Sequence, residues 1–281
     1  MFSMLYGIAS ALSWGIADFA GGLASRKLSL YLVVFYGNIV GLLALVIAVA
    51  LYPEVIPEPK SIMFAGLAGL LSSGSLLVLF YSMTCGQMSI AAPVSALFAA
   101  VIPIVVGIFL QGLPSSMQFV GFAFALIAVW FISLGDSQQP FRIDRLSSLR
   151  LPVLAGIGFG CYFIAMHYAI SDSTSAIWLI IAAYTTGTLM TFVFVKIRRE
   201  TFVVQRNTLG VVLLHVAFNV GGNFFFLQAL KSGRLDISSA LGSLYPGATV
   251  ILAWLILKER ICLKQWFGII AALMAIMLFT M

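Results

Sequence analysis

Apolar stretches of about twenty residues follow one another from Leu5 to Leu278, separated by short polar segments. A helix needs roughly 20 residues to cross a hydrocarbon core of ~30 Å, and unpaired backbone amides are costly in lipid. The pattern therefore predicts an all-α membrane protein. Its ten expected spans have the approximate bounds 2–24, 30–52, 61–85, 88–110, 116–135, 150–170, 175–197, 207–231, 234–257 and 263–280.

Composition supports this fold class. Charged residues make up 9% of the chain and apolar residues 62%, which is outside the range of ordinary soluble domains. A membrane β-barrel would alternate apolar and polar residues along strands of ~10 residues. The stretch 119–132 is apolar on every face instead, so an α-helical bundle is expected.

The most polar segment of the chain lies near its middle, at 136–149. Shifting one half along the other by 147 positions aligns 74–133 with 221–280 without a gap, with 11 identities in 60 pairs. The chain is therefore expected to contain a first five-helix repeat at 1–136, a polar linker at 137–149 and a second repeat at 150–281. The matched pairs include Gly86 with Gly233, Gln118 with Gln265, and Gly121 with Gly268.

Two tandem repeats of five spans must lie in opposite orientations across the membrane, the inverted-repeat plan found in many secondary transporters. Even-numbered loops hold only Lys60, Lys231 and Arg234. By the positive-inside rule the odd loops face the cytoplasm and both termini lie outside. Those odd-numbered loops hold the other basic residues: Arg26, Lys27, Arg142, Arg145, Arg150, Lys196, Arg198, Arg199, Arg206, Lys258, Arg260 and Lys264.

The segment 243–279 carries a recognisable pattern: a Tyr-Pro pair in the ninth span, a Glu-Arg pair at its end and a glycine that opens the tenth span. It resembles the closing signature of the drug/metabolite transporter superfamily, specifically its ten-span EamA-type members. The opening segment 14–29 is also similar to the first span of these transporters. The residues of the signature are Tyr245, Pro246, Glu259, Arg260 and Gly268.

The resemblance implies export or exchange of small metabolites, amino acids or drugs by alternating access. The expected partners are a small-molecule solute, protons and the lipid bilayer of the cytoplasmic (inner) cell membrane, with the chain acting as a monomer or homodimer. No nucleotide-binding loop of the Gly-x-x-x-x-Gly-Lys-[Ser/Thr] type occurs, so a secondary transporter is favoured. An uncoupled facilitator and, in another class, a lipid-headgroup flippase are the alternatives.

Asp18 is the expected proton-coupling residue. It is the only carboxylate deep in an expected span, and an ionisable side chain there is costly unless it has a function or a partner. Its helical neighbours Gly15, Gly21 and Gly22 form a face of small residues, so Asp18 is expected to point into the bundle. The structural alternative is a cap or a bridge to neighbouring helices or to the basic residues of the first loop.

A polar stripe follows the eighth span, where His215, Asn219 and Asn223 recur at intervals of four residues. Such a stripe must face protein or a water-filled cavity, so these residues are candidates for the substrate cavity. Asparagines that only join helices are the alternative. Four aromatic residues are further candidates for substrate contact: Tyr81, Tyr184, Tyr245 and Trp178.

Three prolines lie in the equivalent spans four and nine: Pro93, Pro103 and Pro246. Each frees a backbone carbonyl and bends its helix, which suits gates, although packing is the default for membrane prolines. Glu259 and Arg260 are interpreted as a charge pair at the membrane edge. Rows of small residues predict close helix contacts, as in Gly37-x-x-x-Gly41.

Enzymatic function is not expected. An intramembrane enzyme would need a zinc-binding His-Glu-x-x-His helix, two buried aspartates or a serine aligned with a histidine, and the sequence supplies none of these sets. No cofactor, metal or nucleic-acid partner is expected. The three cysteines have no paired spacing, and the basic residues lie at helix ends, where membrane topology explains them.

Overall fold

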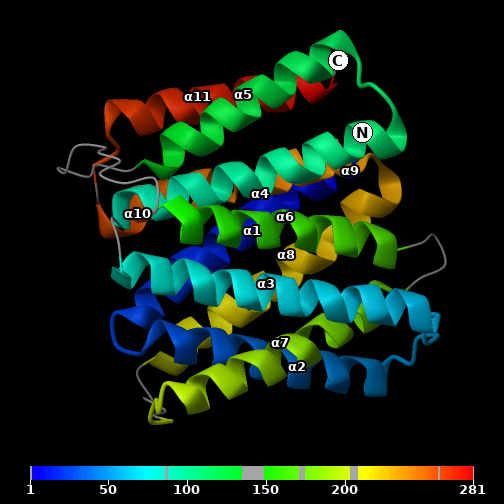
Figure 1. Cartoon of the computed structure of the whole chain (residues 1–281), viewed down its shortest axis with the longest axis vertical. Helices are drawn as coiled ribbons and strands as arrows, with labels where there is room; N and C mark the ends of the chain where they lie inside the picture. The colour runs from blue at the N-terminus through cyan, green and yellow to red at the C-terminus, as the bar shows by residue number, and fades with distance from the viewer. Residues whose placement is uncertain are drawn as a thin grey trace.

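The computed structural model describes residues 2–85, 88–134, 149–170, 175–202, 208–258 and 260–280, and these ranges contain helices and no strands. The helices lie roughly side by side in one bundle (Figure 1). They are α1 (Phe2–Ser25), α2 (Leu30–Leu51), α3 (Pro59–Cys85), α4 (Met88–Gln111), α5 (Ser116–Ser133), α6 (Arg150–Ala169), α7 (Ala176–Ile197), α8 (Leu209–Ser232), α9 (Leu235–Gly242), α10 (Tyr245–Leu257) and α11 (Leu263–Thr280).

The all-α, ten-span prediction is confirmed, with one change in the ninth span. Nine segments of the described ranges are long and apolar enough to cross a membrane, the last but one being Leu235–Leu257. α1 has the length, carries Asp18 and several Ser and Gly residues, and is not among these nine.

The ninth span is not one bent helix. It is interrupted at Ser243 and Leu244, which separate α9 from α10. Pro246 lies in the first turn of α10, where a missing backbone N–H removes no helical hydrogen bond. Pro93 and Pro103 lie inside α4, which continues past both of them. The two equivalent spans therefore use proline differently: the fourth is continuous and the ninth is broken.

The helix contacts follow an internal two-fold relation between the halves. α5 packs against α11, and α2 packs against α7, so each of these helices meets its own counterpart. α1 is equivalent to α6 and α3 to α8, so the contact of α1 with α8 corresponds to that of α6 with α3. In the same way, α4 packs on α6, and its equivalents α9 and α10 pack on α1. Since each half holds five spans, the halves have opposite orientations, as the sequence predicts.

The pair α5 and α11 shows this relation at atomic detail. A Cβ atom built on Gly121 would lie 2.8 Å from the Phe279 ring, and one on Gly268 would lie 2.8 Å from Ile132. Residues 132 and 279 are themselves equivalent under the shift of 147 positions. These matched glycines let the last helices of the two halves pack closely.

Both helices of this pair also begin with the same cap. The Gln118 side chain accepts a hydrogen bond from the backbone N–H of Ser115 at 3.1 Å, and Gln265 accepts one from Cys262 at 3.1 Å. Each glutamine thus satisfies a backbone donor at the start of a helix, a group that no helical carbonyl can reach. The identity between Gln118 and Gln265 has this local physical cause.

The other rows of small residues also lie at helix contacts. Ser3 donates a hydrogen bond to the carbonyl oxygen of Ala229 at 3.0 Å. Cβ atoms built on Gly7 and Gly156 would lie 3.0 Å from Leu241 and 2.6 Å from Phe98. The prediction that rows of small residues lie at helix contacts is therefore confirmed at these positions, and the helices that meet there are α1 with α8 and α9, and α6 with α4.

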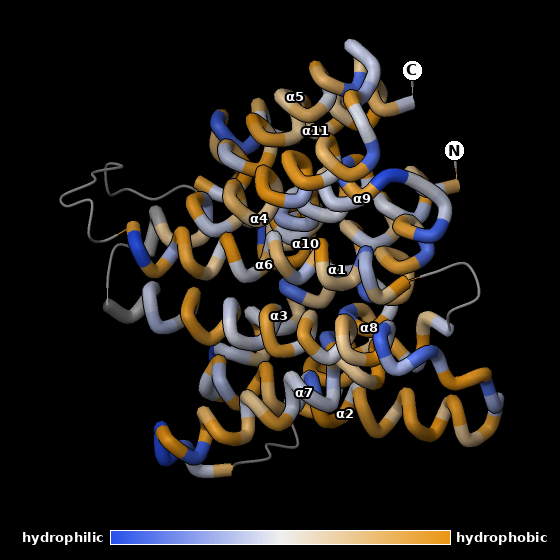
Figure 2. Tube along the Cα trace, turned by 45° about the vertical axis from the view of Figure 1, so that its right-hand side comes forward, coloured by the Kyte–Doolittle hydropathy of each residue, from blue (hydrophilic) through white to orange (hydrophobic). Residues whose placement is uncertain are grey.

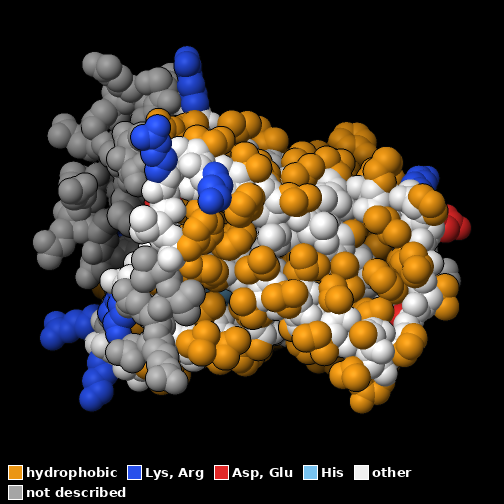
Figure 3. Space-filling view, turned by 90° about the horizontal axis from the view of Figure 1, so that it is seen from below, with side chains coloured by type: hydrophobic (Ala, Val, Ile, Leu, Met, Phe, Trp, Pro, Cys, Tyr) orange, Lys and Arg blue, Asp and Glu red, His pale blue; other side chains and the backbone are white. Residues whose placement is uncertain are grey.

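Apolar and basic residues occupy different parts of the bundle. Apolar residues cover the helices along their length (Figure 2), as a lipid-facing surface requires. In Figure 3, most Lys and Arg side chains in view gather at one end of the helices. Both termini lie at the opposite end (Figure 1).

Candidate functional site

A polar cavity of about 90 Å³ lies between the two halves of the bundle. Its lining residues come from α1, α2 and α3 of the first half and from α6, α7 and α8 of the second. Five sequence candidates meet there: Asp18, Tyr184, His215, Asn219 and Asn223. The cavity is large enough for a few water molecules or a small solute.

Asp18 faces this cavity from α1. Its side chain is exposed to the cavity although helices surround that part of α1. One turn earlier, Gly15 packs against α10, where a built Cβ would lie 2.7 Å from the carbonyl oxygen of Tyr245. The small residues around Asp18 thus bring neighbouring helices close, while the carboxyl group itself stays open to a solute or to water.

His215 is wedged between α1 and α2. Its Nδ1 lies 2.8 Å from the carbonyl oxygen of Ala17. Because a carbonyl can only accept, Nδ1 carries the hydrogen in this arrangement. Cβ atoms built on Gly21 and Gly37 would lie 3.0 Å and 2.9 Å from the imidazole ring, so both glycines make room for it. The ring is both a helix contact and part of the cavity wall.

The two asparagines of the stripe form a hydrogen-bonded set. The Asn223 amide nitrogen donates to the backbone oxygen of Asn219 at 2.8 Å and to its side-chain oxygen at 3.0 Å. The Tyr162 hydroxyl donates to the Asn223 side-chain oxygen at 2.5 Å. Asn223 therefore joins α8 to α6 and keeps both polar ends of its amide engaged beside the cavity.

Four polar lining residues were absent from the sequence candidates: Asn38, Ser72, Ser73 and Tyr162. Asn38 donates a hydrogen bond to Ser73 at 3.3 Å, which joins α2 to α3. Asn38 could have been found by the argument used for Asn219, since it is a lone amide within an apolar span. Tyr162 gives no such signal, because a tyrosine in a span is ordinary.

Three of the four aromatic candidates are not among the residues that line the polar cavity. Tyr81 lies near the end of α3, where the Arg198 guanidinium carbon is 5.6 Å from the centre of its ring. Tyr245 begins α10 and packs in the apolar cluster formed with α5 and α11. Only Tyr184 lines the cavity.

Trp178 lines a different space, an open apolar groove of about 620 Å³ between α3 and α7. Its indole N–H donates to the backbone oxygen of Glu54 at 3.2 Å. The groove is formed mainly by apolar side chains such as Met63, Leu67 and Ile181. Of the expected membrane-edge pair, Arg260 is exposed just after α10, whereas Glu259 lies outside the described residues.

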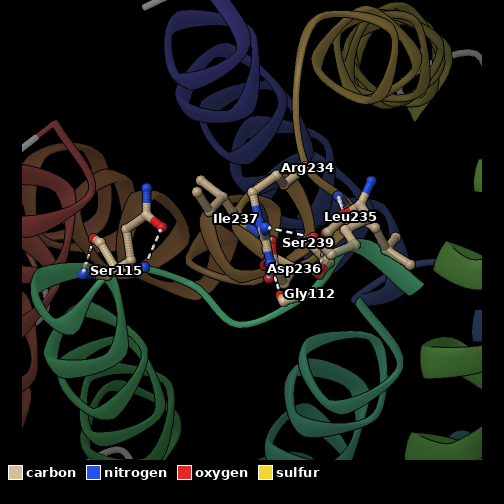
Figure 4. Close-up of polar contacts among 9 residues, drawn as sticks. Gly112, Ser115, Arg234, Leu235, Asp236, Ile237 and Ser239 are labelled. Carbon is tan, nitrogen blue, oxygen red and sulfur yellow. Dashed lines mark hydrogen bonds and ion pairs between the residues drawn. The ribbon is translucent and has the colours of Figure 1, made fainter. Parts of the chain in front are cut away.

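A second carboxylate, Asp236, is fully buried at the start of α9, at the end of its span rather than deep within it. It pairs with Arg234 at 2.7 Å and accepts a hydrogen bond from the Ile237 backbone N–H at 2.8 Å. Arg234 also donates to the carbonyl oxygens of Gln111 and Gly112 at 3.0 and 2.6 Å, as Figure 4 shows in part.

This network ties the end of α4 to the start of α9, which are equivalent spans of the two halves. The Gln111 side chain adds a bond from the Leu235 backbone N–H at 2.8 Å. Sequence reasoning placed Arg234 in a loop and missed its partner. The spacing Arg-x-Asp at a helix start was the available signal, because a carboxylate there can both cap the helix and hold an arginine.

Within the ranges that the structure describes, no group of three or more His, Cys, Asp or Glu side chains could hold a metal ion. Two inverted five-span halves around a polar cavity define a class of membrane protein, that of multi-span proteins with the architecture of secondary transporters.

Sequence comparison places the chain within this class. The EamA-like transporter family matches residues 1–134 and 147–281, and the chain belongs to this family. Its members are membrane transporters of small solutes. No curated protein matches the sequence. A solved structure described only as "Crystal structure of protein" has a TM-score of 0.83 and 13% sequence identity, covering 99% of this chain and 96% of its own, so it shows the fold alone.

Proposed function

We propose that the protein is a secondary active transporter that exports or exchanges small amphipathic metabolites such as amino acids, by alternating access coupled to protons. The observation that carries the proposal is the open carboxyl group of Asp18 in a polar cavity between two inverted halves. Substrate and coupling-ion sites of inverted-repeat transporters lie at the interface of the repeats. The location of Asp18 at this interface supports a role in binding a proton or a solute.

The chemistry of the lining favours a solute with an amine group. Asp18 is acidic, and no Lys or Arg is among the described lining residues. The titratable groups around it are His215 on α8, Tyr162 on α6 and Tyr184 on α7, with Tyr245 of α10 near enough for electrostatic interaction. A carboxylate with neutral neighbours attracts either a proton or an ammonium group, so the two compete for one site.

Movement of the halves is supported by the glycine-rich contacts between them. A Cβ atom built on Gly69 would collide with the Ala183 carbonyl oxygen, and one on Gly158 would collide with Ser75. Both contacts join a helix of the first half to a helix of the second. Helices that meet at glycines have no side chains interlocking at these points, so they can slide past one another by small distances. Through such movements the cavity would open alternately to each side of the membrane.

The test is efflux of a labelled amino-acid panel from cells that express the protein or its Asp18→Asn variant, with and without a proton uncoupler. We expect uncoupler-sensitive efflux from the wild type and its loss in the variant. Glu58→Gln is the matched control, since Glu58 is an exposed carboxylate in the segment before α3 and should transport like the wild type.

Efflux that is indifferent to the uncoupler and to Asp18→Asn would refute proton coupling and leave an uncoupled facilitator. Absence of efflux for every member of the panel would refute the amino-acid part of the proposal.

A further inference from the structure

The Tyr184 hydroxyl is a buried polar group that the polypeptide leaves without a partner. The side chain is 6% exposed and lines the same cavity as Asp18. Its hydroxyl has no hydrogen bond within the described part of the chain. A buried hydroxyl without a partner is costly, and most such groups in proteins are paired. A bound solute that offers an acceptor would remove this cost.

Asn223 is a polar residue beside Tyr184. Its amide nitrogen donates twice to Asn219 and its oxygen accepts from Tyr162. The amide oxygen has a second lone pair, but no hydrogen bond joins it to the Tyr184 hydroxyl. The two tyrosines line one cavity and differ in this respect: one hydroxyl is used to hold helices together and the other is available.

The Tyr184 ring is also fixed in place. A Cβ atom built on Gly41 of α2 would lie 2.5 Å from Tyr184 Cε1 and 2.9 Å from Cδ1. The ring edge formed by Cδ1 and Cε1 thus lies against α2 at Gly41, with no room for a side chain at that position. A ring held in this way presents its hydroxyl at one position, as a recognition group requires.

We propose that Tyr184 selects solutes that carry a hydrogen-bond acceptor beside an amine, by donating its hydroxyl hydrogen to that acceptor. The proposal rests on the proposed function, in which Asp18 binds the amine. Because the cavity has a volume of only about 90 Å³, one small solute can reach both walls. The solute class is then small α-amino acids and their neutral derivatives, in preference to simple amines.

The experiment measures equilibrium binding of three probes to the purified protein in lipid nanodiscs: alanine, alanine amide and ethylamine, which is alanine without its carboxyl group. We expect Tyr184→Phe to weaken alanine and alanine amide binding about tenfold, as for loss of a hydrogen bond to a charged or strongly polar group. Binding of ethylamine should be unchanged, because it offers no acceptor.

Tyr162→Phe is the matched control, since it removes an engaged hydroxyl from the same cavity. It should affect the three probes equally. Gly41→Ala should displace the Tyr184 ring and reproduce the selective loss, provided that the folded protein is recovered by size-exclusion chromatography.

The assignment of Tyr184 would be overturned if Tyr184→Phe weakened binding of all three probes equally or of none of them. It would also be overturned if the wild type bound none of the three probes. Selective binding without any efflux would instead overturn the proposed transport function and leave Tyr184 as a recognition residue.

Discussion

The charge of Asp236 is fully buried and depends on its partners at the start of α9. Replacing it by alanine leaves Arg234 without its ion-pair partner and the Ile237 backbone N–H without an acceptor. The Arg234 side chain is 26% exposed and keeps its bonds to Gln111 and Gly112, so the expected loss is about 1–3 kcal/mol, below that of a fully buried ion pair. We therefore expect Asp236→Ala to lower the melting temperature in detergent by several degrees, measured by fluorescence-detected size-exclusion chromatography.

Glu58→Ala is the control for this measurement, because Glu58 is exposed and should melt like the wild type. A melting temperature of Asp236→Ala equal to that of the control would show that the pair adds nothing to stability.

Some candidate functional residues could be predicted from the sequence and others could not. Asp18 and the α8 stripe stand out, because a polar side chain in an apolar span needs a cavity or a partner. Asp236 was missed because it lies at the mouth of a span, where charge is ordinary. The unpartnered hydroxyl of Tyr184 could not be predicted at all, since it depends on where α6, α7 and α8 place Tyr162, Tyr184 and Asn223 relative to one another.

At the scale of elements, the contact of α5 with α11 depends on two glycines whose surroundings differ. A Cβ on Gly268 would meet backbone atoms, the Ile132 nitrogen at 2.8 Å and the Ala128 oxygen at 3.1 Å. A Cβ on Gly121 would meet the far edge of the Phe279 ring at 2.8 Å. Because backbone cannot move aside as a ring can, Gly268→Ala should destabilise the protein by about 1–3 kcal/mol and Gly121→Ala by less.

Melting temperatures of the two variants in the same detergent check this difference. Gly210→Ala is the control, since a Cβ there meets nothing within 4 Å, and alanine should slightly stabilise the start of α8. Equal losses for Gly121→Ala and Gly268→Ala would contradict the asymmetry.

Nearly all helix bounds could be predicted, because the lipid bilayer fixes both the length and the apolar character of each element. The break between α9 and α10 could not. Pro246 was visible in the sequence, but a proline signals a kink inside a helix and a first helical turn alike. Which of the two occurs depends on tertiary contacts, here the complete burial of α9 and its ties to α4.

At the scale of the whole molecule, the duplication and the inverted orientation were predictable from three signals: odd span number, matched glycines and unequal loop charge. The internal two-fold relation then appears as physical contacts, such as α1 with α8 and α6 with α3. The size and shape of the cavity were not predictable, because they depend on how closely side chains of six helices approach one another.

Membrane orientation follows from the same asymmetry of charge. The loop between α1 and α2 carries Arg26 and Lys27, and it belongs to the odd-numbered loops that hold twelve of the fifteen Lys and Arg residues. Positive charge is retained in the cytoplasm during insertion. With the three native cysteines replaced by serine, we expect a membrane-impermeant thiol reagent to label Glu58→Cys in intact cells and to label Lys27→Cys only after permeabilisation. The reverse pattern would place the basic loops outside and contradict the predicted orientation.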